Sequence, residues 1–243
     1  MNKLLSTLLA LSVACATGLA QAQTPAASAP AAAPVAAAPA PAPAPRQAPA
    51  GAKTVEAKVA MCIGCHGIKG YQASFPEVYK VPMISGQSAK YIAAALAAYK
   101  TGDRKHPTMR GISESLTDQD VADISAFYEN HGKGGKPLAD KPSREPNAQV
   151  AALLQKAACA SCHGANFSKP IDPSYPKISG QHADYLFVAL KAYKTENNPA
   201  VGRNNGVMGA IAKQYSNAEL KVLANYMASL DGELITKPER KFR

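Results

Sequence analysis

Apolar residues recur at the spacing of an amphipathic helix in three stretches of the chain. The pattern predicts helices over residues 88–101, 117–130 and 216–230. Thr117 stands at the N-cap of the second helix, and Ser216 with Glu219 forms a capping box at the start of the third. No segment shows the alternation of apolar and polar residues that is typical of a strand. The sequence therefore predicts a mainly α fold.

The chain contains an internal duplication. Residues 82–101 read PMISGQSAKYIAAALAAYKT and residues 176–195 read PKISGQHADYLFVALKAYKT, with 13 of the 20 positions identical. Each copy follows a Cys-x-x-Cys-His motif and precedes a loop with a methionine and a final helix. This order predicts two tandem domains, at 53–131 and 148–243, joined by a linker at 132–147 that is rich in Gly, Pro and charge.

The first 52 residues have the composition of export and spacer segments. Lys3, an uncharged apolar stretch and Ala20-Gln21-Ala22 predict a signal peptide over residues 1–22. Residues 23–52, dominated by Ala and Pro, predict an extended linker. The protein is therefore expected in the periplasm. An uncleaved signal, the alternative, would tether it to the inner membrane.

Four of the five cysteines lie in two matching motifs, Cys62-Ile63-Gly64-Cys65-His66 and Cys159-Ala160-Ser161-Cys162-His163. Two cysteines three positions apart can reach the two vinyl groups on one edge of a haem. A histidine directly after the second cysteine then presents its imidazole to the iron. The motifs therefore predict two covalently bound haem c groups, one in each repeat.

Three other kinds of site compete with haem attachment. A Cys₄ zinc site needs 15–20 residues between its pairs, whereas Cys65 and Cys159 are 94 positions apart. A thioredoxin-like redox pair needs a βαβ context, which the pattern does not predict. A disulfide within each motif suits an exported protein, but it does not explain why a histidine follows both pairs.

The second axial ligand of each iron is expected to be a methionine. Met109 lies 43 residues after His66 and Met208 lies 45 residues after His163, both in Gly-flanked loops before the final helix of their repeat. His/Met ligation raises the potential, as in electron-transfer cytochromes c. His106 is a rival ligand in the first repeat.

Two prolines recur at matched places, Pro82 and Pro176, which lie 16 and 13 residues after the haem histidines. The carbonyl of each could accept the Nδ1–H of the axial histidine and tune its basicity. A simple role at the start of the following helix is the alternative. Tyrosines and glutamines that recur in the same stretches could reach haem propionates. These are Tyr91 with Tyr185, Tyr99 with Tyr193, and Gln87 with Gln181.

The net charge of +10 concentrates in the second repeat. It predicts redox protein partners with acidic docking surfaces that approach this repeat. Nucleic acid is not expected as a partner of an exported haem protein. The chain lacks the apolar stretches of a multispan membrane protein, so membrane contact is expected only through partners or an uncleaved signal anchor.

The paired Cys-x-x-Cys-His motifs, the repeated Pro-x-Ile-Ser-Gly-Gln and one late methionine per half resemble the dihaem cytochrome c4 family of class I cytochromes c. The resemblance covers residues 55–235. It implies two small helical bundles, each around a covalently bound haem, with the two haems close together. It also implies that His66 with Met109, and His163 with Met208, are the axial pairs.

The same resemblance implies an electron carrier without substrate chemistry of its own. It would carry electrons in the respiratory chain between a membrane donor complex and a terminal oxidase or reductase. Two alternatives remain, a dedicated haem subunit of an oxidase or dehydrogenase and a dihaem peroxidase-type enzyme. The long Ala/Pro segment and the longer second methionine loop depart from the family's pattern.

Overall fold

The computed structural model describes residues 53–135 and 137–239. The expected signal peptide and the Ala/Pro linker, residues 1–22 and 23–52, lie outside the described residues. Every element below belongs to one compact unit, Pro49–Arg243. Within the described residues, no helix is both long and apolar enough to cross a bilayer.

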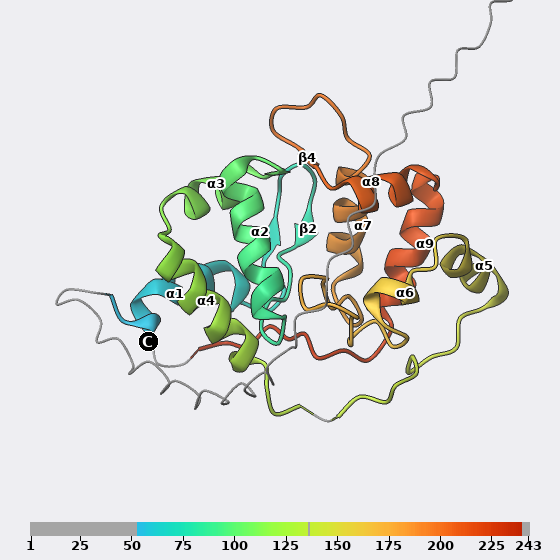
Figure 1. The fold of residues 1–243 in the computed structure, drawn as a ribbon, viewed down its shortest axis with the longest axis horizontal. Coiled ribbons are helices and arrows are strands. Elements are labelled where there is room, and N and C mark those ends of the chain that lie inside the picture. The colour runs from blue at the N-terminus through green and yellow to red at the C-terminus, as the bar shows by residue number, and fades with distance from the viewer. Residues whose placement is uncertain (1–52, 136, 240–243) are drawn as a thin grey trace, which may run out of the picture. The chain divides into compact units, whose positions relative to one another are not determined.

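The first repeat is built from helices with three very short strands between them (Figure 1). In chain order its elements are α1 (Val55–His66), β1 (Gln72–Ala73), β2 (Tyr79–Lys80), α2 (Ala89–Thr101), β3 (Arg104–Lys105), α3 (Pro107–Glu114) and α4 (Asp118–His131). Helix α2 packs against α3 and α4, and α1 packs against α4. The bundle therefore places α1, which carries the first cysteine motif, against the final helix.

The helices of the second repeat follow the same order with one interruption, and its described residues contain no counterpart of β1 and β2. Its elements are α5 (Ala148–Lys156), α6 (Ala160–His163), α7 (Ala183–Ala192), β4 (Gly202–Arg203), α8 (Gly206–Lys213) and α9 (Asn217–Ala228). Helices α5 and α7 both pack against α9. The break between α5 and α6 contains Ala158 at a φ of +46°, a left-handed conformation, whereas α1 continues unbroken through its motif.

The three predicted helices are confirmed as α2, α4 and α9. Thr117 and Asp120 form a capping box on α4, and Ser216 and Glu219 form one on α9. Each box satisfies backbone N–H groups that the first turn of a helix leaves without partners. These local signals fix where the final helix of each repeat begins.

The expectation of no strands is wrong in detail. Four two-residue strands form two antiparallel pairs, β1 with β2 and β3 with β4. Two residues are too few to display an alternating pattern, which is why the sequence did not reveal them. The second pair sets Arg104 opposite Arg203 and thereby joins the two repeats.

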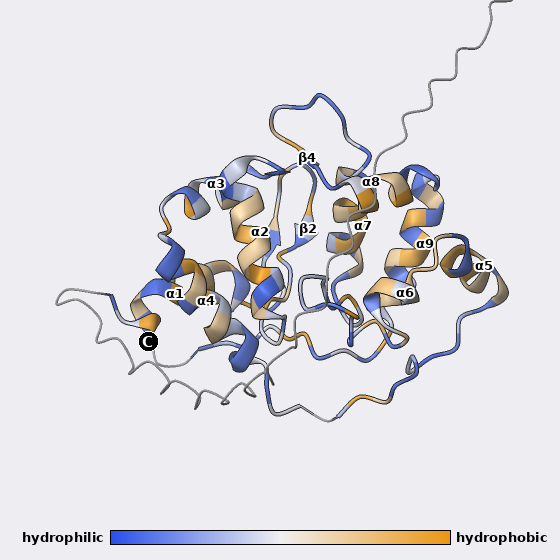
Figure 2. Cartoon of the chain, viewed as in Figure 1, coloured by the Kyte–Doolittle hydropathy of each residue, from blue (hydrophilic) through white to orange (hydrophobic). Residues whose placement is uncertain are grey.

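Each repeat has an apolar core of its own (Figure 2). In the first, Val59 of α1 meets Ile92 and Leu96 of α2 and Ile124 and Tyr128 of α4. The core of the second repeat is divided between two clusters that share α9. The periodic positions of the predicted helices therefore supply most of the buried contacts.

The segment that follows the final helix of each repeat packs against the other repeat. Beyond α9, Ile235 N–H donates to the Ser85 carbonyl at 3.1 Å and Lys237 Nζ donates to the His131 carbonyl at 3.1 Å. Beyond α4, the linker carbonyl of Ala139 accepts from Asn166 Nδ2 at 2.7 Å. The linker predicted from its composition is therefore attached to the second repeat along part of its length.

In each repeat a glycine after the final helix lies directly against the Ser-Gly-Gln turn. A Cβ on Gly132 would lie 2.2 Å from Gly86 N, and one on Gly232 would lie 2.1 Å from the Ser179 carbonyl oxygen. The neighbouring atoms belong to the backbone and cannot rotate away. Only glycine permits these approaches.

We expect Gly132→Ala and Gly232→Ala each to destabilise the folded protein by about 3 kcal/mol, the upper end of the usual cost of overpacking. Gly135→Ala is the control, because nothing lies within 4 Å of its added Cβ. Urea unfolding followed by haem absorbance measures the difference. Equal midpoints for Gly132→Ala and Gly135→Ala would contradict the close approach.

Candidate functional site

The first cysteine motif occupies the last two turns of α1. Cys62, Cys65 and His66 all lie on this helix, which Thr54 caps at its start. A spacing of three places the two cysteines on one face. Cys62 packs against the core of the first repeat, and so does Met109 of α3. The structure therefore brings a predicted attachment residue and a predicted ligand to the same core.

The second motif stands on the short helix α6. Cys159 is its N-cap, and Cys162 and His163 form its end. All four described cysteines are free thiols, so neither motif contains a disulfide. Burial raises the pKa of Cys62 to about 11 and also raises the pKa of Cys159.

A proline carbonyl holds each motif histidine. The His66 Nδ1 lies 2.8 Å from the Pro82 carbonyl oxygen, and His163 Nδ1 lies 3.0 Å from that of Pro176. Because a carbonyl only accepts, each Nδ1 carries the hydrogen and Nε2 is left for a metal. Burial lowers the pKa of both histidines, while the carbonyl contact acts in the opposite direction. The imidazoles are thus held neutral and oriented.

The two predicted methionine ligands lie on short helices, not in the loops that the sequence suggested. Met109 is in the first turn of α3 and its N–H donates to the N-cap residue, His106 Nδ1, at 3.3 Å. Met208 stands in the same place on α8, where its N–H donates to Asn205 Oδ1 at 2.9 Å. Pro107 and the flanking glycines obscured these helices, since both residue types score poorly in helix interiors.

His106 therefore has a structural role that the second repeat gives to an asparagine. Its Nδ1 caps α3, while its Nε2 is buried without a hydrogen-bond partner among the described residues. His106 is also close enough to His66 to lower the pKa of that imidazole. If His106 rather than Met109 binds the first iron, its Nε2 is the atom that would do so.

We expect His106→Asn, which copies the cap of α8, to leave the far-red Met–Fe(III) absorption band of the first haem unchanged. Asparagine is a good N-cap, so α3 should keep its start. Optical spectra of the oxidised protein measure the band. If the spectrum instead changes ligand type in His106→Asn, then His106 and not Met109 binds the first iron.

Two guanidinium groups face four tyrosine rings near the β3–β4 pair. Arg104 Nη2 donates to Tyr91 Oη at 3.0 Å, and Arg203 Nη2 donates to Tyr185 Oη at 3.0 Å. Each guanidinium also lies over the rings of two tyrosines of its own repeat. Neither forms a salt bridge with a carboxylate of the described part of the chain. The haem carries two propionate carboxylates, so this donor set fits such a group.

The glutamines of the repeated motif form hydrogen bonds across the junction between the two repeats. Gln87 and Gln181 are each 4% exposed and bind the backbone of the opposite repeat, at Lys177 and Met83. The sequence missed this role because Met83 and Lys177 differ in side chain, which concealed that their peptide groups are used identically. The recurrence of glutamine marks both positions but does not identify their partners.

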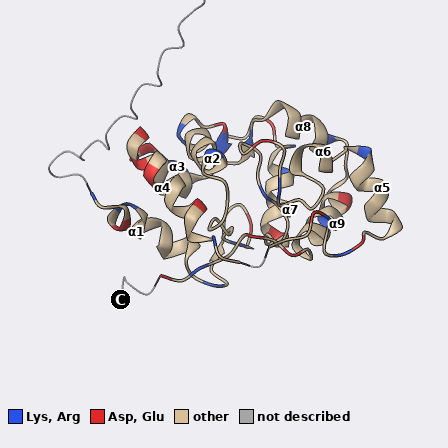
Figure 3. Cartoon of the chain, turned by 60° about the horizontal axis from the view of Figure 1, so that its bottom comes forward, with Lys and Arg blue, Asp and Glu red and all other residues tan. Residues whose placement is uncertain are grey.

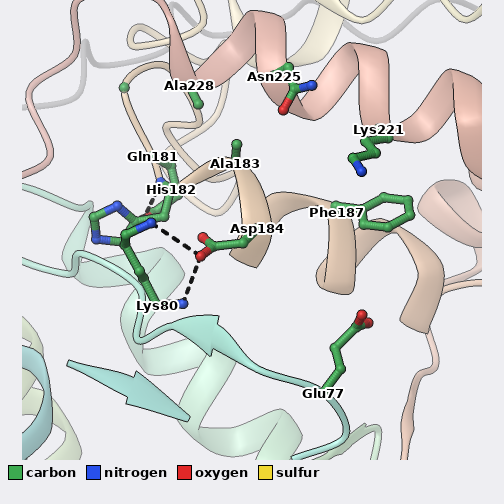
Figure 4. Close-up of a pocket in the computed structure, with 11 residues that line it drawn as sticks. Glu77, Lys80, Gln181, His182, Ala183, Asp184, Phe187, Lys221, Asn225 and Ala228 are labelled. Atoms are coloured by element: carbon green, nitrogen blue, oxygen red, sulfur yellow. Dashed lines mark hydrogen bonds and ion pairs between the residues drawn. The ribbon is translucent and has the colours of Figure 1, made fainter. Parts of the chain in front are cut away.

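A surface pocket of about 490 Å³ lies beside this junction (Figure 4). Lys80 of the first repeat crosses it, and its Nζ lies 3.4 Å from Asp184 Oδ2 of the second. None of the cysteine motifs or predicted methionine ligands lines it. The described residues also contain no group of three or more His, Cys, Asp or Glu side chains able to hold a metal ion. The pocket is therefore separate from the predicted haem sites.

The Cytochrome c family model matches the chain twice in tandem, over residues 48–132 and 147–231. The chain belongs to the cytochrome c family. The two matches contain one Cys-x-x-Cys-His motif each, and the family's chemistry is covalent attachment of haem c. This cytochrome therefore carries two covalently bound haem c groups in tandem domains, and it takes part in electron transport.

Several relatives of this cytochrome are cytochromes c4. Cytochrome c4 of Thiocapsa roseopersicina is 30% identical to it over 187 residues, and the alignment covers 72% of this chain and 90% of that one. Cytochrome c4 of Stutzerimonas stutzeri is 28% identical to it over 192 residues, and the alignment covers 74% of this chain and 89% of that one. A thiosulfate dehydrogenase electron acceptor of Thiomonas intermedia is 26% identical to it over 182 residues, and the alignment covers 71% of this chain and 79% of that one.

Solved structures show the same similarity. Reduced recombinant cytochrome c4 from Pseudomonas stutzeri has a TM-score of 0.51 and 25% identity, covering 73% of this chain and 97% of that one. A thiosulfate dehydrogenase from Marichromatium purpuratum has a TM-score of 0.50 and 26% identity, covering 70% of this chain and 36% of that one. The tandem, helix-rich fold expected from the resemblance to the dihaem cytochrome c4 family is confirmed.

Proposed function

We propose that this cytochrome is a periplasmic electron shuttle in which each repeat holds its haem iron between a histidine and a methionine. The strongest support for this proposal is that the contacts of the histidine and the methionine are the same in both repeats. In both repeats a proline carbonyl orients the motif histidine, and an N-cap side chain holds the backbone of the methionine. The proposed axial pairs are His66 with Met109 and His163 with Met208.

The remaining site residues take three roles in this proposal. The motif cysteines form the thioether bonds, namely Cys62, Cys65, Cys159 and Cys162. Pro82 and Pro176 set the tautomer and direction of each imidazole through their carbonyls. Arg104 and Arg203 would offset propionate charge. When bound, the haem supplies reversible one-electron oxidation and reduction of its iron.

We also propose the domain limits 53–131 and 148–243, with residues 132–147 as the linker between them. The signal peptide over 1–22 would direct export to the periplasm, and residues 23–52 would act as a spacer. If the signal remains uncleaved, the same spacer would tether the haem domains to the inner membrane.

The charge distribution supports docking of an acidic partner at the second repeat. Acidic residues gather on α4 of the first repeat (Figure 3), but Lys58 bridges Asp120 and Asp123 at 2.9 and 2.6 Å. In the second repeat Lys191 and Lys194 are also engaged, with Glu77 and with the Tyr215 carbonyl. Lys221 of α9 is exposed and forms no hydrogen bond or ion pair within the described residues. It is therefore the better probe of docking.

We expect Lys221→Glu to slow electron transfer with an acidic redox partner at low ionic strength, and the difference to vanish at high salt. Lys69→Glu, an exposed change in the first repeat, is the matched control. Stopped-flow mixing of the reduced cytochrome with the oxidised partner gives both rates. Equal rates for the two variants at low salt would contradict docking at the second repeat.

A second candidate function is that of a dedicated electron acceptor for a sulfur-compound dehydrogenase. The relative in Thiomonas intermedia carries this description, and part of the Marichromatium purpuratum enzyme has the same fold. Both candidates require partner proteins and neither gives this chain substrate chemistry of its own.

One experiment tests the shuttle proposal and the candidate subunit role together. The oxidised cytochrome is mixed anaerobically with thiosulfate, with and without a thiosulfate dehydrogenase catalytic subunit, and the reduced cytochrome is mixed with peroxide. Neither role allows reduction by thiosulfate alone or turnover of peroxide, and reduction that requires the dehydrogenase is the result expected of the dedicated acceptor. Reduction by thiosulfate alone, or steady peroxide turnover, would contradict the proposal. Stable copurification with the dehydrogenase would favour the subunit role.

A further inference from the structure

The peptide group between Pro82 and Met83 is hydrogen-bonded on both sides. Its carbonyl oxygen lies 2.8 Å from His66 Nδ1, as described above. Its N–H, which belongs to Met83, donates to Gln181 Oε1 at 3.0 Å. His66 is in the first repeat and Gln181 is in the second. A single peptide unit therefore links a motif histidine to a side chain of the opposite repeat.

The second repeat contains the same chain of hydrogen bonds, with the roles of the two repeats exchanged. His163 Nδ1 lies 3.0 Å from the Pro176 carbonyl oxygen, and the N–H of the same peptide unit, on Lys177, donates to Gln87 Oε1 at 3.1 Å. The two chains are thus crossed. Each begins at a histidine of one repeat and ends at a glutamine of the other.

Both glutamines are held firmly in place. Each uses its amide nitrogen as well, because Gln181 Nε2 donates to the Met83 carbonyl at 2.9 Å and Gln87 Nε2 donates to the Lys177 carbonyl at 3.0 Å. Each Oε1 also accepts the N–H of the next residue in its own chain at 3.0 Å. Since both side chains are 4% exposed, water has little access to compete for these bonds.

Hydrogen bonds that share a peptide group polarise one another. An acceptor on the N–H side draws electron density towards the carbonyl oxygen, which then accepts more strongly from the imidazole Nδ1–H. A stronger acceptor makes the histidine a more basic ligand and favours the oxidised metal. Loss of the glutamine amide should therefore weaken the histidine as a donor and raise the potential of the iron that it binds.

We propose that Gln181 and Gln87 are positioning residues that act across the junction, each tuning the axial histidine of the opposite repeat. Gln181 sets the potential of the first haem through His66, and Gln87 sets that of the second through His163. This inference rests on the proposed histidine ligation. It implies that separation or realignment of the two repeats changes both potentials without any change in the residues that contact either iron.

The test is a pair of isosteric variants of the holoprotein, Gln181→Met and Gln87→Met, each studied by optical redox titration. Gln181→Met should raise the potential of the first haem and leave the second close to its original value, and Gln87→Met should do the reverse. A second readout is the paramagnetically shifted Nδ1–H proton resonance of the axial histidine, which should move only for the opposite repeat. Gln181→Asn and Gln87→Asn shorten the side chain by one methylene and so move the amide away from the peptide group. They provide the same test if a methionine variant does not accumulate.

The interface control is Lys90→Ala, which removes the 3.2 Å contact between Lys90 Nζ and Asp172 Oδ1 without touching either peptide unit. It should leave both potentials unchanged. Equal shifts of both haems in each glutamine variant, a shift confined to the variant's own repeat, or no shift would each overturn the proposal. Met109→Leu assigns the two titration steps to the two haems. If Met109→Leu moves neither step, the proposed ligation fails, and that result is distinct from an uncrossed response to the glutamine variants.

Discussion

Met109→Leu is expected to remove the Met–Fe(III) absorption band of one haem and to lower the potential of that haem, with the other haem unaffected. Leucine keeps the size of the side chain but has no sulfur to donate to iron. Axial ligands set haem potentials over a range of roughly 0.8 V, so the loss of one ligand is a large effect. Optical redox titration with the far-red band as readout measures both changes.

Met208→Leu is the repeat-matched experiment and should affect the other haem in the same way. Met61→Leu is the control, since this methionine directly precedes the first motif but is 49% exposed. It should leave the band and both potentials as they are. A full band in Met109→Leu would show that another side chain completes the first site, with His106 Nε2 as the first to test.

The double substitution Cys159→Ala with Cys162→Ala is expected to halve the covalent haem content, from two haems per chain to one. Without the two thioether bonds the second repeat has no covalent link to its haem. A domain of this size depends on such a link for part of its stability. The haem-to-protein ratio after acid extraction of non-covalent haem measures the loss.

Cys62→Ala with Cys65→Ala should give the same ratio through the first repeat, and Cys15→Ala should leave two haems per chain. Peptide mass spectrometry of the unaltered protein provides a check that does not depend on the variants folding. The peptides containing Cys62 with Cys65 and Cys159 with Cys162 should each carry the mass of one haem. Unmodified cysteines in either peptide would contradict covalent attachment in that repeat.

The parts of the fold that the sequence predicted are those with local signals. The N-cap at Thr117 and the capping box at Ser216 were predicted because their partners lie within three positions, so a short window contains the whole interaction. The duplication of the Ser-Gly-Gln turn and its following helix was visible for the same reason. A covalent haem motif is also local, because two cysteines and a histidine span five positions.

The features that the sequence did not predict are pairings between distant residues. Arg104 meets Arg203 across β3 and β4, and each strand is too short to carry a pattern. Gln87 and Gln181 recur visibly, but nothing in either copy of the repeat says that the partner is the other copy. Their targets are backbone groups, which any side chain at Met83 or Lys177 would leave available. The helices that carry Met109 and Met208 were missed because they begin with residues of poor helix propensity, Pro107 in α3 and Gly206 in α8.

We propose that both irons are bound by histidine and methionine and exchange single electrons. An optically monitored redox titration of the purified holoprotein, with the far-red Met–Fe(III) band recorded in the oxidised state, tests it most directly. We expect two one-electron steps at high potential and a band intensity corresponding to two methionine-ligated haems. A low-potential step, a high-spin haem or a band of half that intensity would contradict it.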